Sequence, residues 1–141
     1  MKLSDILRTK GTTVFTIGPQ ATLADVVSAM VEHNCGSLVV CEADKVVGII
    51  TERDILQACA SQNRPLSDTC VEERMTRNVV TGSANDKISD VMGWMTEKRI
   101  RHLPVLEKGQ LAGMVSIGDV VKAEHGLLSV ENQYLKHYIQ S

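Results

Sequence analysis

Two short motifs place a hydroxyl group and a carboxylate at the same spacing. Thr51 precedes Asp54 in T-E-R-D, and Ser116 precedes Asp119 in S-I-G-D. A hydroxyl residue three places before an acidic one is typical of a helix capping box, which stabilises a helix by about 1 kcal/mol. The same groups suit a nucleotide, because the hydroxyl and the first helical N–H groups would face a phosphate while the carboxylate accepts the hydrogens of a ribose diol. Both interpretations stay open for either motif alone.

A glycine precedes each motif within an apolar run. V-V-G-I-I contains Gly48 and L-A-G-M-V contains Gly113. A strand is weakened by a glycine, so glycine there indicates a bulge or the close approach of another backbone or a ligand. The recurrence of glycine, hydroxyl and carboxylate in one register favours a pair of ligand sites.

Other catalytic and metal motifs are missing from the sequence. It has no G-x-x-x-x-G-K-[ST], no G-x-G-x-x-G and no H-E-x-x-H. The four cysteines, at positions 35, 41, 59 and 70, form no C-x-x-C pair. We therefore expect no catalysis and no bound metal, and we expect Cys35 and Cys41 to be buried free thiols.

The two motifs belong to two copies of one unit. Residues 14–56 align without gaps to residues 79–121, 65 positions further along. Eleven aligned pairs are identical, among them Gly48/Gly113 and Asp54/Asp119. The predicted organisation is an N-terminal segment (1–13), a first repeat (14–59), a linker (60–78), a second repeat (79–123) and a C-terminal helix (124–141).

Each copy predicts the element order β-α-β-β-α. Apolar residues recur at helical spacing from Leu23 to Val31 and from Ile88 to Met95, so we expect them to be the buried stripes of two helices. Two β-rich runs then flank a tight turn in each copy, and a second helix follows the capping residue. The predicted hairpin strands are 37–41 with 45–50 and 102–106 with 110–115, after short leading strands near Val14 and Val79. A short helical turn is expected at residues 4–8.

With these elements, G-I-I-T-E-R-D, G-M-V-S-I-G-D and R-H-L-P-V make nearly the whole chain resemble a pair of cystathionine-β-synthase (CBS) domains, the regulatory Bateman module. The resemblance implies an α/β (α+β) fold in which two pseudo-symmetric CBS repeats pack as one module. It also implies one cleft per repeat for an adenosine-containing ligand such as AMP, ATP or NAD, and association into a homodimer.

The resemblance also implies which residues line the two clefts. In the family, adenine lies between aliphatic side chains and backbone, the ribose lies on the Asp, and the phosphates point toward the hydroxyl and nearby basic residues. The first cleft would use Thr16, Cys35, Gly36, Thr51, Arg53 and Asp54. The second would use Thr81, Arg99, Ile100, Arg101, His102, Pro104, Ser116 and Asp119. The copies differ in their basic residues, and Val39 stands where the second repeat has Pro104.

The net charge, the aromatic content and the length of the apolar runs limit the kinds of partner that this protein can have. A net charge of −2 and only 3% aromatic residues give neither a positive field nor a stacking platform, so no nucleic-acid partner is expected. The apolar runs are far shorter than the roughly 20 residues that span a bilayer, so we expect a cytoplasmic protein without a membrane partner. Trp94, off the core stripe, is either a partly buried core residue or an interface anchor. The apolar side of residues 127–139 favours packing against a second protomer or the sister repeat over contact with a membrane. The predicted function is adenine-nucleotide sensing; the alternative is a structural interaction protein that no longer responds to ligand.

Overall fold

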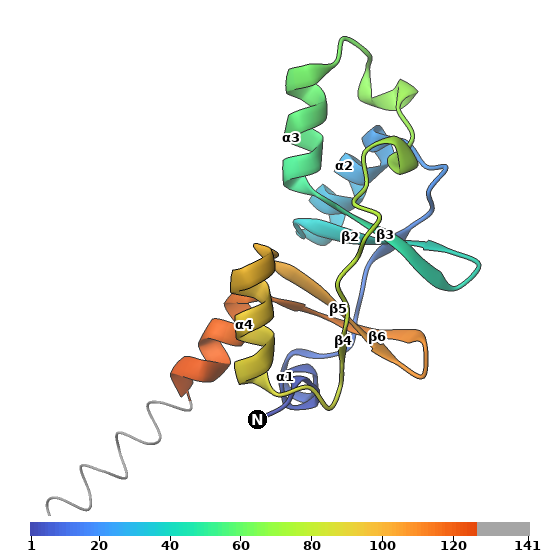
Figure 1. Cartoon of the computed structure of the whole chain (residues 1–141). Helices are drawn as coiled ribbons and strands as arrows, with labels where there is room; N and C mark the ends of the chain where they lie inside the picture. The colour runs from blue at the N-terminus through green and yellow to red at the C-terminus, as the bar shows by residue number, and fades with distance from the viewer. Residues whose placement is uncertain (127–141) are drawn as a thin grey trace, which may run out of the picture. The chain divides into compact units, whose positions relative to one another are not determined.

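The computed structural model describes residues 1–126, and their contacts divide the chain into two units (Figure 1). The first-repeat unit consists of residues 13–80 and 108–112. The second-repeat unit consists of residues 1–12, 81–107 and, within the described part, 113–126. Each unit contains one three-stranded sheet, so the predicted α+β fold with two repeats is confirmed.

The sheet of the first-repeat unit has the order β1-β2-β3. β1 (Thr16–Ile17) pairs in parallel with β2 (Ser37–Glu42), and β2 pairs antiparallel with β3 (Lys45–Thr51). The hairpin turn at Ala43 and Asp44 has positive φ at both residues, as a tight two-residue turn requires. This hairpin confirms the predicted strand pair.

Two helices, α2 (Leu23–His33) and α3 (Glu52–Ser61), complete the core of this unit. Leu38, Val40 and Ile50 of the sheet and the α2 residues Leu23 and Val26 are buried in one cluster. The helical spacing that predicted this stripe fails at its end, because Val31 is 78% exposed. Met30, the residue before it, is buried, so Val31 lies at the edge of the buried face of α2.

The segment after α3 completes the same core. It forms two single 3-10 turns, Leu66–Asp68 and Val71–Glu73, and Val71 is fully buried. A two-bond bridge then joins Ile49 of β3 to Thr76, with N···O distances of 3.0 and 2.9 Å. The stretch predicted as a linker therefore packs against the first repeat over part of its length.

The second-repeat unit repeats the sheet with the order β4-β5-β6. Its elements are α1 (Leu3–Lys10), β4 (Gly82–Ser83), α4 (Ile88–Lys98), β5 (His102–Glu107), most of β6 (Gln110–Ser116) and a helix over residues 117–126. The first residues of β6, 110–112, group with the first-repeat unit. β4 pairs in parallel with β5, as β1 does with β2. Both leading strands begin two to three residues later than predicted, at Thr16 and Gly82.

Helix α1 packs on the second repeat. Its residues Leu3 and Leu7 are buried, and a Cβ on Gly113 of β6 would lie 2.6 Å from Leu7 Cδ2. The glycine therefore makes room for the side chain of Leu7, where the sequence predicted a bulge or the approach of a backbone. The expected turn at residues 4–8 is a full helix. The predicted helix within residues 127–139 lies outside the described residues.

Candidate functional site: two capped strand–helix junctions

The first candidate site is built where β3 runs into α3. Thr51 is the N-cap of α3 and its Oγ1 accepts a hydrogen bond from the Asp54 backbone N at 3.4 Å. The Asp54 Oδ2 atom in turn accepts from the Thr51 backbone N at 2.9 Å and from Thr51 Oγ1 at 3.2 Å. The predicted capping box is thus formed.

The same junction recurs between β6 and the helix at 117–126. The Ser116 backbone N donates to Asp119 Oδ2 at 2.9 Å, and the Asp119 backbone N donates to Ser116 Oγ at 3.1 Å. At both junctions the cap uses only Oδ2 of the carboxylate. Among the hydrogen bonds of residues 1–126, none reaches Oδ1 of Asp54 or Asp119, so each carboxylate keeps an acceptor for a further donor.

The sheets bring other predicted residues to the same ends. Antiparallel pairing sets Ser37 opposite Thr51, so Gly36 lies beside the start of α3. The Glu52 backbone N donates a hydrogen bond to the Gly36 carbonyl at 3.0 Å. The second unit repeats this bond, from Ile117 N to the Arg101 carbonyl at 2.8 Å. The start of the second strand and the N-cap of the following helix therefore face one another in both repeats.

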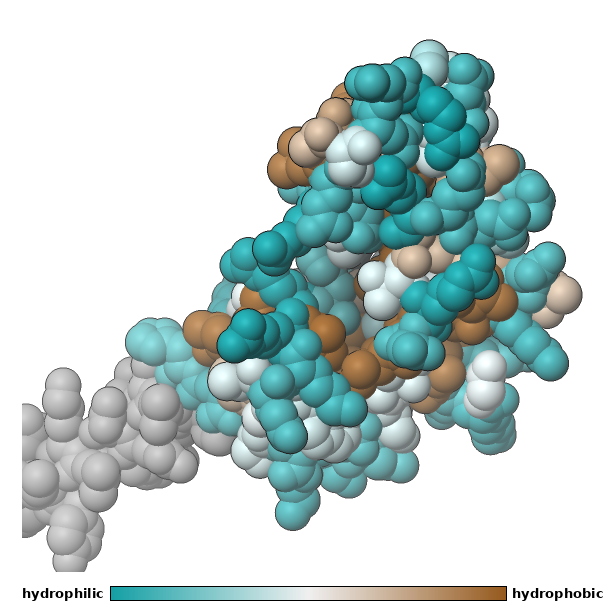
Figure 2. All heavy atoms as spheres, turned by 45° about the horizontal axis from the view of Figure 1, so that its top comes forward, coloured by the Kyte–Doolittle hydropathy of each residue, from teal (hydrophilic) through white to brown (hydrophobic). Residues whose placement is uncertain are grey.

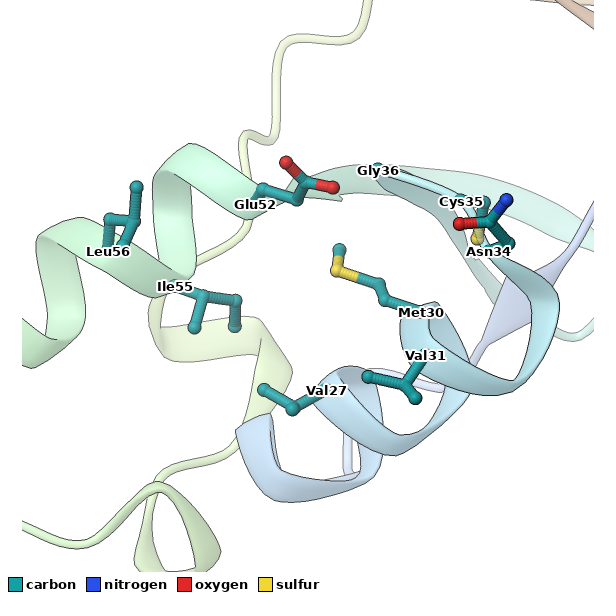
Figure 3. Close-up of a pocket in the computed structure, with 9 residues that line it drawn as sticks. All are labelled: Val27, Met30, Val31, Asn34, Cys35, Gly36, Glu52, Ile55 and Leu56. Atoms are coloured by element: carbon teal, nitrogen blue, oxygen red, sulfur yellow. The ribbon is translucent and has the colours of Figure 1, made fainter.

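A cavity of about 590 Å³ opens next to the first junction, between α2 and α3. Figure 3 shows Val27 and Met30 from α2 and Ile55 from α3 projecting toward it. Cys35 and Gly36 are among its lining residues. The other four residues predicted for the first cleft, Thr16, Thr51, Arg53 and Asp54, do not line this cavity.

Those four residues are placed as follows. Thr16 is exposed on β1, opposite Val39 of β2, and Arg53 is exposed in the first turn of α3. Thr51 and Asp54 are half-buried at the junction. Cys35 is also only half-buried, so the expected burial of its thiol was wrong.

Cys41, the other thiol expected to be buried, is half-buried as well. Its pKa is nevertheless raised, first because burial disfavours the thiolate and second because the Asp44 carboxylate is close. The thiol form is therefore favoured, and a reactive thiolate is not what this position provides.

The second repeat gathers its predicted residues along the approach to β5. Arg99 ends α4 with φ of 55°, a left-handed conformation that costs a non-glycine residue about 1 kcal/mol. Ile100 is half-buried, and its N–H donates to the Met95 carbonyl at 3.1 Å. Arg101 is exposed, and His102 opens β5 in a partly exposed position.

Thr81 and Pro104 lie on the neighbouring strands of that unit. Thr81 is exposed directly before β4, and Gly82 pairs with Val105, which sets Thr81 at the level of Pro104. Pro104 is buried in β5. All eight residues predicted for the second cleft therefore lie in the second-repeat unit, and all six of the first lie in the first-repeat unit.

The charges around the two junctions differ. Glu52 begins α3, and its Oε1 lies 3.0 Å from where a Cβ on Gly36 would be. The aligned positions of the second repeat are the apolar Ile117 and the basic Arg101. The first junction therefore has Glu52 and Arg53 where the second has Ile117 and Gly118. It has Gly36 where the second has Arg101.

Sequence reasoning missed one residue of the second junction. Lys10, the last residue of α1, places Nζ 2.6 Å from Asp119 Oδ2. Burial raises the pKa of Asp119, but hydrogen bonds from Lys10 and Ser116 outweigh it and lower the pKa overall. The two partners are 109 positions apart, and no local motif connects them.

Among residues 1–126, no group of three or more His, Cys, Asp or Glu side chains is arranged to hold a metal ion. Within the same residues, no helix is long and apolar enough to cross a bilayer.

Comparison with known proteins shows the family. The model of the CBS domain matches the chain twice, at residues 3–61 and 71–126. The chain therefore belongs to the CBS-domain family and carries a tandem pair of these domains.

Two relatives are similar to most of the chain. The chain is 41% identical over 124 residues to an uncharacterised 17.7 kDa protein of Acidianus ambivalens, covering 86% of this chain and 72% of that protein. It is 38% identical over 147 residues to the mitochondrial CBS domain-containing protein CBSX3 of Arabidopsis thaliana, and the match covers 98% of this chain and 71% of that protein.

Solved structures agree with the fold. A CBS-domain-containing protein from Agrobacterium tumefaciens superposes with a TM-score of 0.83 at 41% identity, covering 88% of this chain and 99% of that one. The CBS domain pair of protein MJ0100, solved with 5-methylthioadenosine and S-adenosyl-L-methionine, superposes with a TM-score of 0.79 at 26% identity. The match covers 89% of this chain and 97% of that one.

The family matches and the compact units divide the chain differently. The first matched domain starts at residue 3, yet residues 1–12 pack with the second repeat. The second starts at residue 71, yet residues 71–80 pack with the first repeat. The leading segment of each matched domain thus completes the unit of the other domain.

Proposed function

We propose that this protein is a regulatory module that binds adenosine-containing ligands, such as AMP, ATP or NAD, in one cleft per repeat and has no catalysis of its own. The observation that carries the proposal is the repeated strand–helix junction, at which a capped helix and its carboxylate face the start of the preceding hairpin strand in both repeats. Occupancy would be transmitted by changing self-association or the surface offered to a protein target.

The chemistry of the junction fits a ribose with attached phosphate. Oδ1 of Asp54 or Asp119 is an acceptor for a ribose hydroxyl, and the hydroxyl of Ser116 can donate to a phosphate oxygen. The hydroxyl of Thr51 donates to Asp54 Oδ2 and has to turn away from it to donate to a phosphate. The backbone amides at the start of the helix attract the phosphate charge. The half-buried Ile100 and the backbone of Cys35 and Gly36 supply apolar contact and hydrogen-bonding groups for adenine.

Similarity to the MJ0100 pair supports the ligand class. The two ligands named for that structure share an adenosine moiety and differ in the group attached to the 5′ carbon. A site that recognises the ribose and adenine accepts several such ligands. We therefore propose the adenosine part as the common element and the 5′ substituent as the part that distinguishes one cleft from the other.

We also propose that the module is a homodimer. Leu56 on α3 is 69% exposed and Val31 on α2 is 78% exposed, beside the cavity of the first repeat. Val121, aligned with Leu56 in the second repeat, is 50% exposed. Figure 2 shows hydrophobic patches among the polar surface. Because both repeats expose an apolar residue at the same position, a second copy of the chain matches them both; stable interfaces bury about 1,600 Å² in total.

Equilibrium dialysis of the purified chain against AMP, ATP and NAD, together with thermal denaturation, tests the proposal. A ligand present at 100 times its dissociation constant adds about 2.7 kcal/mol per site to the free energy of unfolding. Mass spectrometry of small molecules released from denatured protein identifies a ligand that co-purifies. Absence of binding and of any thermal shift with all three ligands at millimolar concentration contradicts the proposal and favours a purely structural interaction protein.

A further inference from the structure

Lys10 is a cation held at the second junction by the fold. The backbone of α1 is anchored to the second repeat, since Leu3 N donates to the Asp86 carbonyl at 3.0 Å and Ser4 N to the Ala84 carbonyl at 2.9 Å. Leu7 is buried against Gly113, one helical turn before Lys10. The end of α1 is therefore fixed, and the lysine side chain extends from a rigid base to the carboxylate.

The ion pair occupies the atom that a bidentate ribose contact needs. Asp119 Oδ2 already accepts from the Ser116 backbone N at 2.9 Å and from Lys10 Nζ at 2.6 Å. Two donors fill the lone pairs of that oxygen, so a diol that uses both carboxylate oxygens has to displace the ammonium. The lysine side chain is about one-third exposed, which leaves it room to move.

Within residues 1–126, the first repeat has no lysine at its junction carboxylate. The segment after α3 resembles α1 in its buried residues, since Val71 and Leu3 are both fully buried and Met75 packs on Gly48 as Leu7 packs on Gly113. Beyond Met75 the segments differ, because α1 stays helical to Lys10 whereas Thr76 forms a bridge with Ile49. No described residue forms an ion pair with the carboxylate of Asp54. The cation is therefore a difference between the two clefts.

We propose that Lys10 is a specificity-determining residue of the second cleft, which makes this cleft prefer phosphorylated adenosine ligands over unphosphorylated adenosine. This inference rests on the proposed function. A neutral ribose that takes the carboxylate leaves an ammonium without its partner. A 5′ phosphate supplies a new partner for the same ammonium, so the cost of displacement is recovered only with a charged ligand.

The preference is measured as the ratio of two affinities. Equilibrium dialysis gives the dissociation constants of adenosine and AMP for the full chain, for Lys10→Met and for the charge-retaining Lys10→Arg. Lys45→Met is the matched control, because Lys45 is an exposed lysine of the other repeat without an ion pair among the described residues. The measurement uses low and constant ionic strength, since salt screens a partly exposed pair.

We expect Lys10→Met to lower the preference for AMP over adenosine by about 3- to 10-fold, the range between exposed and well-formed charge-assisted bonds. Adenosine affinity should not fall. Lys10→Arg and Lys45→Met should keep the preference of the unmodified chain. In an Asp119→Asn background, Lys10→Met should leave the affinity for adenosine unchanged, because no ion pair remains to be displaced, while the affinity for AMP should fall because the phosphate loses its partner.

The possible results distinguish an error in the role of Lys10 from an error in the proposed function. A preference unchanged within twofold in Lys10→Met, or equal falls in the affinities for adenosine and AMP, overturns the role of Lys10 and leaves the proposed function intact. If adenosine, AMP, ATP and NAD all fail to bind the unmodified chain, the proposed function is wrong, and the role of Lys10 is wrong with it.

Discussion

Replacing Gly48 with alanine tests whether the segment after α3 is an integral part of the first repeat. A Cβ at this position would lie 2.5 Å from the Met75 sulfur and 3.0 Å from the Thr76 carbonyl oxygen. The sulfur belongs to a flexible but buried side chain, whereas the carbonyl is held by the bridge to Ile49. The new methyl group therefore requires the segment to move away from β3.

The expected magnitude is a balance of two effects. Overpacking of a core costs about 1 to 3 kcal/mol. Alanine gains about 0.5 to 1 kcal/mol over glycine through the lower entropy of the unfolded chain. We expect Gly48→Ala to lower the free energy of unfolding by about 1 to 2 kcal/mol, which for a chain of this size is a fall in melting temperature of roughly 3 to 6 °C.

Urea and thermal denaturation followed by circular dichroism measure this change. Gly93→Ala is the matched control: Gly93 lies inside α4 with no heavy atom within 4 Å of an added Cβ, so helix propensity should stabilise it by about 1 kcal/mol. If Gly48→Ala is as stable as Gly93→Ala, the packing of residues 75 and 76 on β3 is wrong.

Three further predictions concern association, charge and pH. Leu56→Asp should convert the dimer into a monomer in light scattering, while Asp at the neighbouring exposed Gln57 should not; a monomeric unmodified chain at tens of micromolar contradicts the dimer. Arg101→Ala should lower the binding affinity for ATP about 10-fold more than that for adenosine, whereas the control Lys98→Ala should lower neither. Equal losses of affinity for both ligands in a titration would show that Arg101 has a structural role. The pKa of Asp119 is held below its ordinary value of 3.8, so its stabilisation is present above that pH and is lost as the pH falls through the lowered pKa; the melting temperatures of the unmodified chain and Asp119→Asn should therefore converge below about pH 4, and a constant difference down to pH 3 refutes the ion pair.

The sequence predicted the repeated elements because their signals are local. Each hairpin is marked by alternation around a turn, and each capping box lies within four consecutive residues, Thr51 to Asp54 and Ser116 to Asp119. Side chains and backbone three positions apart necessarily meet when a helix begins there. These features were confirmed without any knowledge of tertiary contacts.

The remaining features depend on contacts between distant segments. The burial of Val71 could not be predicted from the sequence. Val71 belongs to a single 3-10 turn, which is too short to show helical or strand periodicity. Lys10 reaches Asp119 only because α1 packs on the second repeat. The exposure of Val31, next to the buried Met30, depends on which other elements cover that side of α2.

The central claim, that the junction carboxylates bind a ribose, is tested most directly by comparing three aspartates with the same capping geometry. In each of the helices that begin after Thr22, Thr51 and Ser116, the N-cap backbone N donates to the carboxylate at 2.9 Å, from Asp25, Asp54 and Asp119 respectively. Alanine at any of the three should cost about 1 kcal/mol of stability. Only Asp54→Ala and Asp119→Ala should also weaken the binding of AMP or ATP measured by calorimetry, by about 10- to 150-fold at the affected cleft. Unchanged affinity in both variants, or an equal loss in Asp25→Ala, would contradict the claim and leave all three residues as helix caps.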